Sequence, residues 1–427
     1  MAFAPGVAST AFAPGVASTA SLLDALVVVT VAVVGLVYGL NRFDVAESVR
    51  YVLAVAFGLR VLYAFVADYW GVFAGRYDFG KFDAALWAVA RGFRTLDLGP
   101  FLRYAHAEPF YPVYTLTFSP LYALFGHETI LVRLLMALVG TLFVYNVYRL
   151  ARTVGTRRTG LYAAGFAAVF PYWIYLSGIF YRDTLVLLAL SQSLYATVRW
   201  QVQDRTVTRA GLSMLAVTIL AGSLRIENFV ALGAMLAVAV LLKYDDTSLA
   251  TRLAGAAVAG GALFVAFLTA FRQALDFDYL RSQRLSLTSG SAAYLPHVVY
   301  RTPIELLSYL PVGICYFLLV PFPWQVHSFK ALLAFAQNVL LWYPALIVAV
   351  VGVRDLLFSH RDATLVMAAY AAVGVVSYAA VEGNVGPAIR HRSQFQLCVV
   401  VFAAVGFVRL IDADCAVEAP SPTSEVE

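Results

Sequence analysis

A series of long apolar segments recurs along almost the whole chain and constrains its fold more than any other feature. Segment 22–40 alone is long enough to cross a bilayer, which takes about 20 apolar residues. Further apolar segments lie at about 48–67, 128–148, 160–177, 184–199, 211–223, 229–242, 253–271, 305–321, 331–351, 363–381 and 394–410. Hydrophobic residues fill 61% of 427 positions and charged residues 13%, so a soluble core could not bury the apolar surface. The sequence predicts an all-α, polytopic transmembrane helical bundle of about 11–13 helices.

Arginine-rich short loops indicate how these segments are oriented, because such loops stay on the cytoplasmic side. Loops 41–50 and 149–159 both carry arginines and are predicted to be cytoplasmic. Segment 111–126 therefore cannot cross the membrane, and with 16 residues and two prolines it is also short for a span. We predict an interfacial or re-entrant helix there, within an external loop over 68–126 that carries interfacial helices.

The remaining chain divides by composition. Residues 1–21 contain a tandem AFAPGVAST repeat and are predicted to form a disordered tail. The transmembrane domain is predicted over 22–410, and the acidic segment 411–427 is predicted to be a second disordered tail. A second external loop is expected over 272–304. Segment 382–393 is also expected outside, although Arg390 and Arg392 argue for the opposite side.

Several classes of protein are disfavoured by missing motifs. The three cysteines are too scattered for a disulfide framework or a CxxC metal site. The chain has no P-loop, no Gly-rich dinucleotide fingerprint and no HExxH metal motif. We expect a membrane lipid partner and no nucleic-acid partner.

Carboxylates in the first external loop are candidates for acid–base or metal chemistry. Asp78 and Asp83 lie near the predicted membrane surface, where a carboxylate could act as a general base. The alternative is that they solvate a loop. Asp83 also suits an N-cap, because a short amphipathic helix is predicted directly behind it.

Two further polar groups interrupt apolar sequence. Arg182 and Asp183 stand between two predicted spans, either as a simple ion pair and helix cap or as part of a site. Arg225 and Glu227 break the apolar stretch 211–242 at a predicted polar elbow between two short helices. Ionisable groups inside apolar segments are costly, and residues two apart on a helix do not face each other, which weakens a simple Arg225–Glu227 pair.

The last cluster begins at Glu382 and includes Asn384, Arg390, His391 and Arg392. Two arginines that flank a histidine are suited to hold a phosphate or pyrophosphate. The alternative is headgroup anchoring at a helix end.

In this order, the clusters resemble the GT-C superfamily of polyprenyl-phosphate-sugar-dependent glycosyltransferases, nearest to its protein-O-mannosyltransferase and aminoarabinose-transferase branch. The family's early Asp, the aromatic residue four positions later and a Gly are matched by Asp78, Phe82 and Gly92. Its Pro-containing interfacial segment, its Arg-bearing helix and its later acidic and basic residues are matched by Glu108-Pro109, Tyr111-Pro112, Arg133, Gly140, Tyr148, Arg149, Asp183 and Arg225. The sequence departs from many relatives because Phe79, and not a second acid, follows Asp78.

The resemblance implies an inverting glycosyltransferase that moves a sugar from a polyprenyl-phosphate-linked donor to a lipid-linked glycan or other acceptor, such as a protein. It implies a multi-pass plasma-membrane protein whose active site faces outside. Asp78 would be the general base, and Glu108, Asp183 or Asp83 would supply a second carboxylate, with the need for a divalent metal left open. The expected substrate-binding residues are Asp83, Arg182, Arg225, Asn384, Arg390, His391 and Arg392.

Two alternatives stay open from sequence. One is a glycan ligase or polymerase that uses a lipid-pyrophosphate oligosaccharide, with His391 as base. The other is a non-enzymatic lipid-glycan flippase or transporter, whose essential charges should lie near the bilayer midplane.

Overall fold

The computed structural model describes residues 19–42, 45–71, 76–202, 207–244, 247–270, 277–288, 290 and 292–417. Within these ranges the regular elements are helices, and one isolated antiparallel β-bridge joins Ala293 to Asn384. The helices are α1 (Thr19–Arg42), α2 (Glu47–Tyr69), α3 (Arg76–Thr95), α4 (Gly99–Ala107), α5 (Tyr111–Phe125), α6 (Thr129–Val154), α7 (Arg157–Val169), α8 (Pro171–Ser177), α9 (Asp183–Val202), α10 (Val207–Leu224), α11 (Asn228–Lys243), α12 (Leu249–Ala270), α13 (Phe277–Leu287), α14 (Pro303–Leu319), η2 (Pro323–Gln325), α15 (Phe329–Gln337), η3 (Asn338–Trp342), α16 (Tyr343–Ser359), α17 (Arg361–Val381) and α18 (Val385–Val417).

Long apolar helices confirm the predicted all-α, polytopic membrane fold. Five continuous helical stretches of the described chain are long and apolar enough to cross a bilayer, namely Glu47–Tyr69, Thr129–Val154, Phe329–Ser359, Arg361–Val381 and Val385–Asp412. Shorter apolar helices accompany them, at Leu23–Gly35, Ser213–Leu224, Asn228–Lys243, Leu249–Val265 and Pro303–Leu319.

Helix α6 lies at the centre of the bundle. It packs against α2, α7 and α9, and most of its side chains are buried. A surface helix would carry a polar stripe along its length, whereas α6 is apolar on nearly every face. One large core cluster extends from α6 through α9 and α11 to α17 and α18, and it connects the two halves of the chain.

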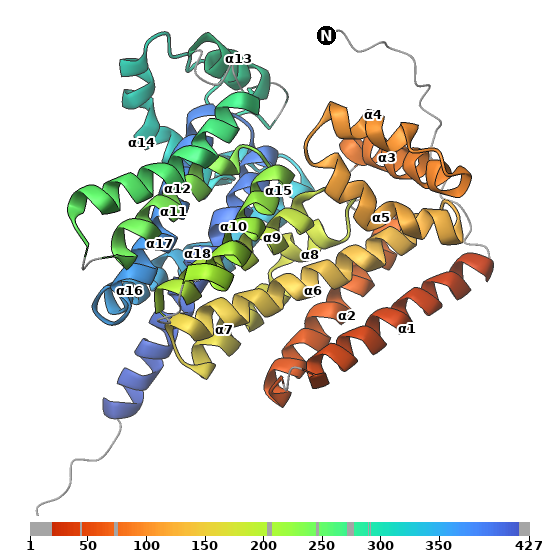
Figure 1. Ribbon diagram of the computed structural model, residues 1–427, viewed down its shortest axis with the longest axis horizontal. Helices are drawn as coiled ribbons and strands as arrows, with labels where there is room; N and C mark the ends of the chain where they lie inside the picture. The colour runs from red at the N-terminus through yellow and green to blue at the C-terminus, as the bar shows by residue number, and fades with distance from the viewer. Residues whose placement is uncertain are drawn as a thin grey trace, which may run out of the picture.

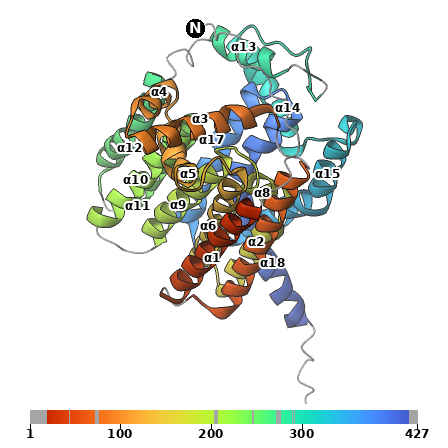
Figure 2. The same ribbon diagram turned by 90° about the vertical axis from the view of Figure 1, so that its right-hand side faces the viewer.

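The two predicted external loops lie at the same end of the bundle. Figures 1 and 2 show α3, α4 and α13 together at the top of the molecule, with the C-terminal end of α18 at the opposite end. At that opposite end, Arg158 at the start of α7 lies 3.6 Å from Asp412 in α18. The predicted cytoplasmic loop 149–159 is therefore at the far end of the molecule from α3.

Helix α5 corresponds to the segment that we predicted would not cross the membrane. It has 15 residues with Pro120 inside it, and it packs mainly on α3 and α4. One face is buried through Tyr114, Phe118 and Tyr122, whereas Leu124 is exposed. The helix thus serves as the platform for α3 and α4.

The predicted span 160–177 is divided into α7 and α8 at Pro171. Proline has no N–H, so the carbonyl of Ala167 loses its helical donor at this point. The guanidinium of Arg60, fully buried in α2, donates to the carbonyls of Ala167 at 3.1 Å and Ala168 at 3.2 Å. The next backbone N–H, of Tyr172, donates to Gln337 instead. Arg60 therefore satisfies the carbonyls that the helix break leaves open.

The chain between α17 and α18 is fixed against the chain between α13 and α14. The N–H of Tyr294 donates to the carbonyl of Gly383 at 2.8 Å, and the N–H of Val385 donates to that of Ala292 at 3.0 Å. Arg284 in α13 also donates to the carbonyl of Glu382. Segments 272–304 and 382–393, predicted to share one side of the membrane, are therefore in contact.

The ends of the predicted domain differ from the helices in detail. Helix α1 begins at Thr19, and α18 continues to Val417, seven residues into the predicted C-terminal tail. Residues 1–18 and 418–427, which carry most of the predicted tails, lie outside the described residues.

Candidate functional site

The carboxylate of Asp183 lies between two arginines that come from distant parts of the chain. Asp183 is the first residue of α9, where a negative charge is favoured by the helix dipole. Arg225 from the elbow between α10 and α11 lies 2.7 Å from Oδ1, and the two side chains are 1% and 2% exposed. Arg390, in the second turn of α18, lies 3.0 Å from Oδ2 and is 21% exposed. The ion-pair network therefore joins three predicted site residues, and Arg225 pairs with Asp183.

The network carries more positive than negative charge. Two guanidiniums share the carboxylate of Asp183, Arg182 adds a third cation, and Glu227 adds a second carboxylate near Arg182 and Arg225. Burial, and next to it the charge of Arg225, lowers the pKa of Arg182, which indicates repulsion among the cations. An anion that entered here would relieve this repulsion. The excess charge is suited to bind phosphate.

Aromatic rings join this network to α3. The guanidinium of Arg390 lies 4.7 Å from the ring centroid of Tyr181, and that ring lies 6.1 Å from the ring of Phe82 in α3. Arg182 lies 4.2 Å from the ring centroid of Phe110, which also contacts Phe82. Such cation–π contacts hold a guanidinium without neutralising it.

Asp78, the predicted general base, occurs one helical turn before Phe82 in α3. Its side chain lies outside the described residues. Its place in the helix therefore rests on the backbone of α3, and its role stays a prediction.

Asp83 does not cap a helix, because α3 already begins at Arg76. Its carboxylate accepts a hydrogen bond from the hydroxyl of Tyr122 at 2.6 Å and lies 2.9 Å from Nε2 of His127. The capping prediction was wrong because the helix extends two turns further toward the N-terminus than its apolar pattern indicated.

Glu108 ends α4 and is exposed. Its N–H donates to the carbonyl of Tyr104, and its own carbonyl accepts from Tyr111. Glu108 thus shapes the turn between α4 and α5 through its backbone.

The cluster near the start of α18 separates into three roles. Asn384 accepts from the N–H of Gly386 at 3.1 Å and shapes the turn before the helix. Arg392 points away from Arg390, because residues two apart on a helix face different directions. It donates to the carbonyl of Val320 at 3.0 Å and to Asn338 at 2.9 Å. Only Arg390 of the two arginines reaches Asp183.

His391 pairs with Glu382, which the sequence placed in this cluster without a role. Nδ1 of the imidazole contacts Oε1 of the carboxyl group. Burial raises the pKa of Glu382 to about 8, against the lowering effect of Arg225 and Arg390. The other carboxyl oxygen, Oε2, is buried without a hydrogen-bond partner in the described part of the chain.

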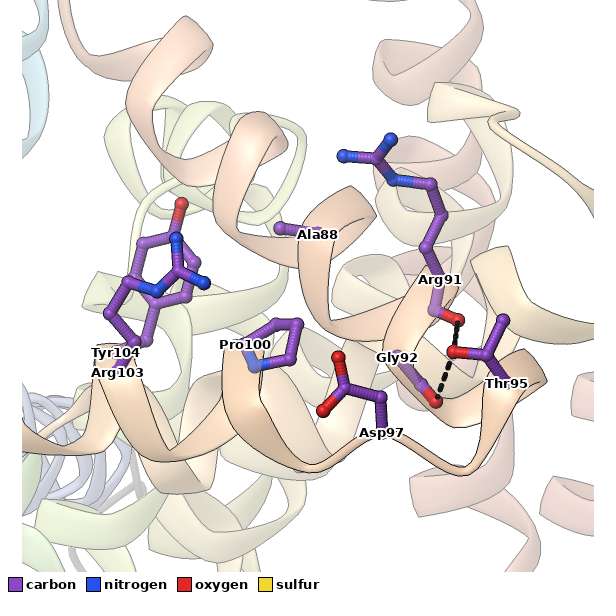
Figure 3. A pocket seen from close by; sticks show the side chains of 8 residues that line it. All are labelled: Ala88, Arg91, Gly92, Thr95, Asp97, Pro100, Arg103 and Tyr104. Atoms are coloured by element: carbon purple, nitrogen blue, oxygen red, sulfur yellow. Dashed lines mark hydrogen bonds between the residues drawn. The ribbon is translucent and has the colours of Figure 1, made fainter.

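A separate surface cavity of about 240 Å³ lies between α3 and α4 (Figure 3). Asp97 lies in the middle of the view, and its Oδ1 accepts from the N–H of Gly99 at 2.8 Å. None of the predicted site residues lines the cavity, whose lining is Ala88, Arg91, Gly92, Thr95, Asp97, Pro100, Arg103 and Tyr104.

Some residues around the site were missed by sequence reasoning. Tyr181 directly precedes the predicted Arg182–Asp183 pair, and this adjacency was the available signal. Tyr378, whose ring lies 4.6 Å from that of His391, sits in an apolar span and gave no signal. In the described residues no group of three His, Cys, Asp or Glu side chains is arranged to hold a metal ion.

Comparison with known families gives one match. Residues 107–270 match the family model described as dolichyl-phosphate-mannose-protein mannosyltransferase. No curated protein matches the chain. The matched region contains Asp183 and Arg225, begins after Asp78 and ends before Arg390. It confirms the predicted resemblance over residues 107–270, where the chain is similar to this family of GT-C membrane glycosyltransferases.

Proposed function

We propose that this multi-pass membrane glycosyltransferase transfers a sugar from a polyprenyl-phosphate-linked donor to a glycan or protein acceptor on the outer face of the plasma membrane. The observation that carries the proposal is the buried Arg225–Asp183–Arg390 network, with its excess positive charge. The family match supports a lipid-phosphate donor, because the matched family is described as using dolichyl-phosphate mannose.

Arg225 and Arg390 bind the donor phosphate in this proposal. When the bond between the sugar and the phosphate breaks, negative charge develops on the phosphate, and fixed guanidiniums stabilise it without reorganisation. Asp183 acts as a positioning residue, because it orients both arginines and offsets part of their repulsion. Arg182, beside Phe110 and Arg225, adds to the positive field.

Asp78 is the proposed general base. It would remove the proton from the acceptor hydroxyl as the oxygen attacks the sugar from the face opposite the phosphate, which inverts the anomeric carbon. The contacts from Phe82 through Tyr181 to Arg390 support this role, since they connect α3 to the phosphate site. Asp83 is already engaged by Tyr122 and His127, which favours Asp78 over Asp83 as the base.

Asp78→Asn should abolish sugar transfer while leaving membrane insertion intact. Loss of a general base typically lowers a rate by about 10²–10⁴-fold. The test is to delete the gene, complement with wild type, Asp78→Asn or the control Asp278→Asn, and analyse cell-surface glycans by mass spectrometry. Asp278 is a suitable control because its carboxylate is 85% exposed in α13.

We expect one sugar to be missing in the deletion strain and in the Asp78→Asn strain, and to be restored by wild type and Asp278→Asn. Full restoration by Asp78→Asn, at equal protein levels, would exclude this residue as the base. Loss of whole glycan chains in the deletion strain would instead favour a ligase or a flippase.

A further inference from the structure

The Glu382–His391 pair is rigidly held at the edge of the proposed phosphate site. Glu382 ends α17, and His391 lies in the second turn of α18. The turn between them is fixed by backbone hydrogen bonds to Ala292 and Tyr294 and by the guanidinium of Arg284. A side-chain pair on such a fixed turn has a defined direction.

The pairing determines which edge of the imidazole is available. Nδ1 faces the carboxyl group, so Nε2 lies on the opposite edge of the ring. The side chain of Glu382 is 1% exposed, whereas that of His391 is 18% exposed. His391 and its neighbour Arg390 are thus partly accessible members of an otherwise buried set, and Arg390 binds Asp183.

The protonation of the pair favours a proton on Nε2. Because burial raises the pKa of Glu382 to about 8, the pair holds an additional proton near neutral pH. Burial and the charges of Arg225 and Arg390 lower the pKa of His391, so this proton is on the carboxyl group, which donates to Nδ1. Nε2 therefore carries the hydrogen of the neutral imidazole and faces away from Glu382.

We propose that His391, oriented by Glu382, is the general acid that protonates the lipid phosphate as it leaves the sugar. This step rests on the proposed function. The bond between the anomeric carbon and the phosphate oxygen breaks, and its electron pair stays on that oxygen. The proton on Nε2 passes to the leaving phosphate while the carboxyl proton of Glu382 passes to Nδ1, so the imidazole stays neutral and Glu382 becomes a carboxylate. The acceptor oxygen forms the new bond to the anomeric carbon, and its own proton passes to Asp78. His391 is catalytic in this scheme, and Glu382 is a positioning residue.

The proton is useful because the leaving phosphate gains a charge. The donor is a phosphodiester with one negative charge, whereas the released lipid phosphate is a monoester that would leave with two. Arg225 and Arg390 stabilise this charge, but both are already shared with Asp183. A proton from His391 reduces the charge that these two arginines must neutralise.

The test uses the full-length chain in lipid nanodiscs with two probes. Polyprenyl-phosphate mannose reports donor cleavage through release of polyprenyl phosphate, and polyprenyl monophosphate reports binding of the leaving group. The variants are His391→Gln, Glu382→Gln, Arg225→Gln and Arg390→Gln. His297→Gln is the control, since His297 is exposed at the same end of the molecule. Thermal unfolding of each variant checks its fold.

His391→Gln should slow donor cleavage by about 10²-fold while polyprenyl monophosphate still binds, whereas Arg390→Gln should weaken its binding. Wild-type cleavage should decline above about pH 8, where the pair loses its proton. Glu382→Gln should move this decline to lower pH, because the extra proton can then be held only by His391, whose pKa is lowered by burial. If Glu382 only supported the fold, Glu382→Gln would lower the rate of donor cleavage without moving its pH profile.

The outcomes separate this proposal from the proposed function. If His391→Gln cleaves the donor like wild type while Arg390→Gln is impaired, the general acid is wrong and the phosphate site stands. If Arg225→Gln and Arg390→Gln both bind and cleave like wild type, the proposed phosphate site itself is wrong. Should His391→Gln prove unstable, the pH profile of Glu382→Gln decides alone, and an unmoved profile overturns the proposal.

Discussion

The arginines inside this molecule have backbone carbonyls or carboxylates as partners, and buried Arg133 has both, Asp68 and the carbonyl of Gly178. Arg60, Arg284 and Arg392 donate mainly to backbone carbonyls that helix ends and breaks leave open. Arg225 and Arg390 instead share the carboxylate of Asp183. Neutral backbone carbonyls accept the hydrogen bonds that a guanidinium can donate. The carboxylate of Asp183, in contrast, carries one negative charge and is shared by two positively charged guanidiniums.

Residue types alone could not make this distinction. The sequence singled out Arg225 because an ionisable group in an apolar stretch is costly, and that signal led to an ion pair. The same signal existed for Arg60, whose partners Ala167 and Ala168 lie more than 100 positions away in the chain. Arg390 and Arg392 were expected to act together, and only the helical backbone shows that they face different neighbours.

His127 should stabilise the protein in a pH-dependent way through Asp83. The hydrogen bond that His127 donates to Asp83, more than offsetting partial burial, raises the pKa of His127 above its ordinary value. The folded state therefore binds the proton more tightly than the unfolded state. The stabilisation is fully present below about pH 6.5, the ordinary pKa, and is lost as the pH rises through the raised value.

Thermal unfolding of wild type and His127→Gln across this pH range checks the prediction. The difference in Tm should be largest at mildly acidic pH and should shrink at alkaline pH. His106→Gln is the matched control, because His106 is exposed and contacts the carbonyl of Leu102. A difference in Tm that stays constant with pH would contradict a charged pair.

At the scale of elements, breaks in the helices define where polar groups can gather. The predicted elbow near Arg225 is present between α10 and α11. Three polar or charged residues lie within positions 225–228 and disfavour a continuous apolar helix there. The break at Pro171 was not predicted, although proline ends a helix by a known mechanism. A local sequence pattern shows where a helix can break. Whether the break forms depends on a distant side chain, such as Arg60, that can donate to the carbonyls left open there.

Arg60→Met should destabilise the protein strongly. The methionine side chain keeps much of the volume but leaves the carbonyls of Ala167 and Ala168 without a donor in an apolar interior. Each unsatisfied buried group costs about 1–3 kcal/mol, so we expect a loss of about 2–5 kcal/mol. Thermal unfolding of the purified protein measures it, with the exposed Arg301→Met as control.

Gly140 in α6 shows how tightly the chain is packed next to Arg60. A Cβ added to Gly140 would lie 2.2 Å from Oγ of Ser177 and 2.9 Å from Nε of Arg60. The sequence matched Gly140 to the family pattern without a physical reason. Here the reason is the close approach of α6 to the end of α8.

An Arg60→Met variant as stable as wild type would show that water replaces the guanidinium at the break before Pro171.

At the scale of the whole molecule, charge and hydropathy predicted the fold class and the placement of the loops better than they predicted contacts between side chains. The all-α membrane class follows from composition, and the arginine rule correctly separated loop 149–159 from the loop that contains α3. The contacts between residues such as Asp183 and Arg390 could not be predicted, because they depend on how distant helices pack. Which end faces outside stays a prediction.

Cysteine accessibility tests that orientation directly. In a chain whose Cys315 and Cys415 are replaced by Ser, Leu96→Cys at the tip between α3 and α4 should react with a membrane-impermeant maleimide on intact cells. Ser359→Cys, exposed at the end of α16, should react only after the cells are permeabilised. Cys398 is buried and can remain as it is. The reverse pattern of labelling would place the proposed active site on the cytoplasmic side.

The network around Asp183 also bears on how the protein is made. Asp183 and Arg225 emerge from the ribosome early, whereas Arg390 belongs to the last long helix. Until α18 has entered the bilayer, the carboxylate has only one of its two guanidiniums and the pair Glu382–His391 does not yet exist. The proposed phosphate site is therefore completed only after α18 has inserted, and a nascent chain cannot use the proposed lipid donor before that point.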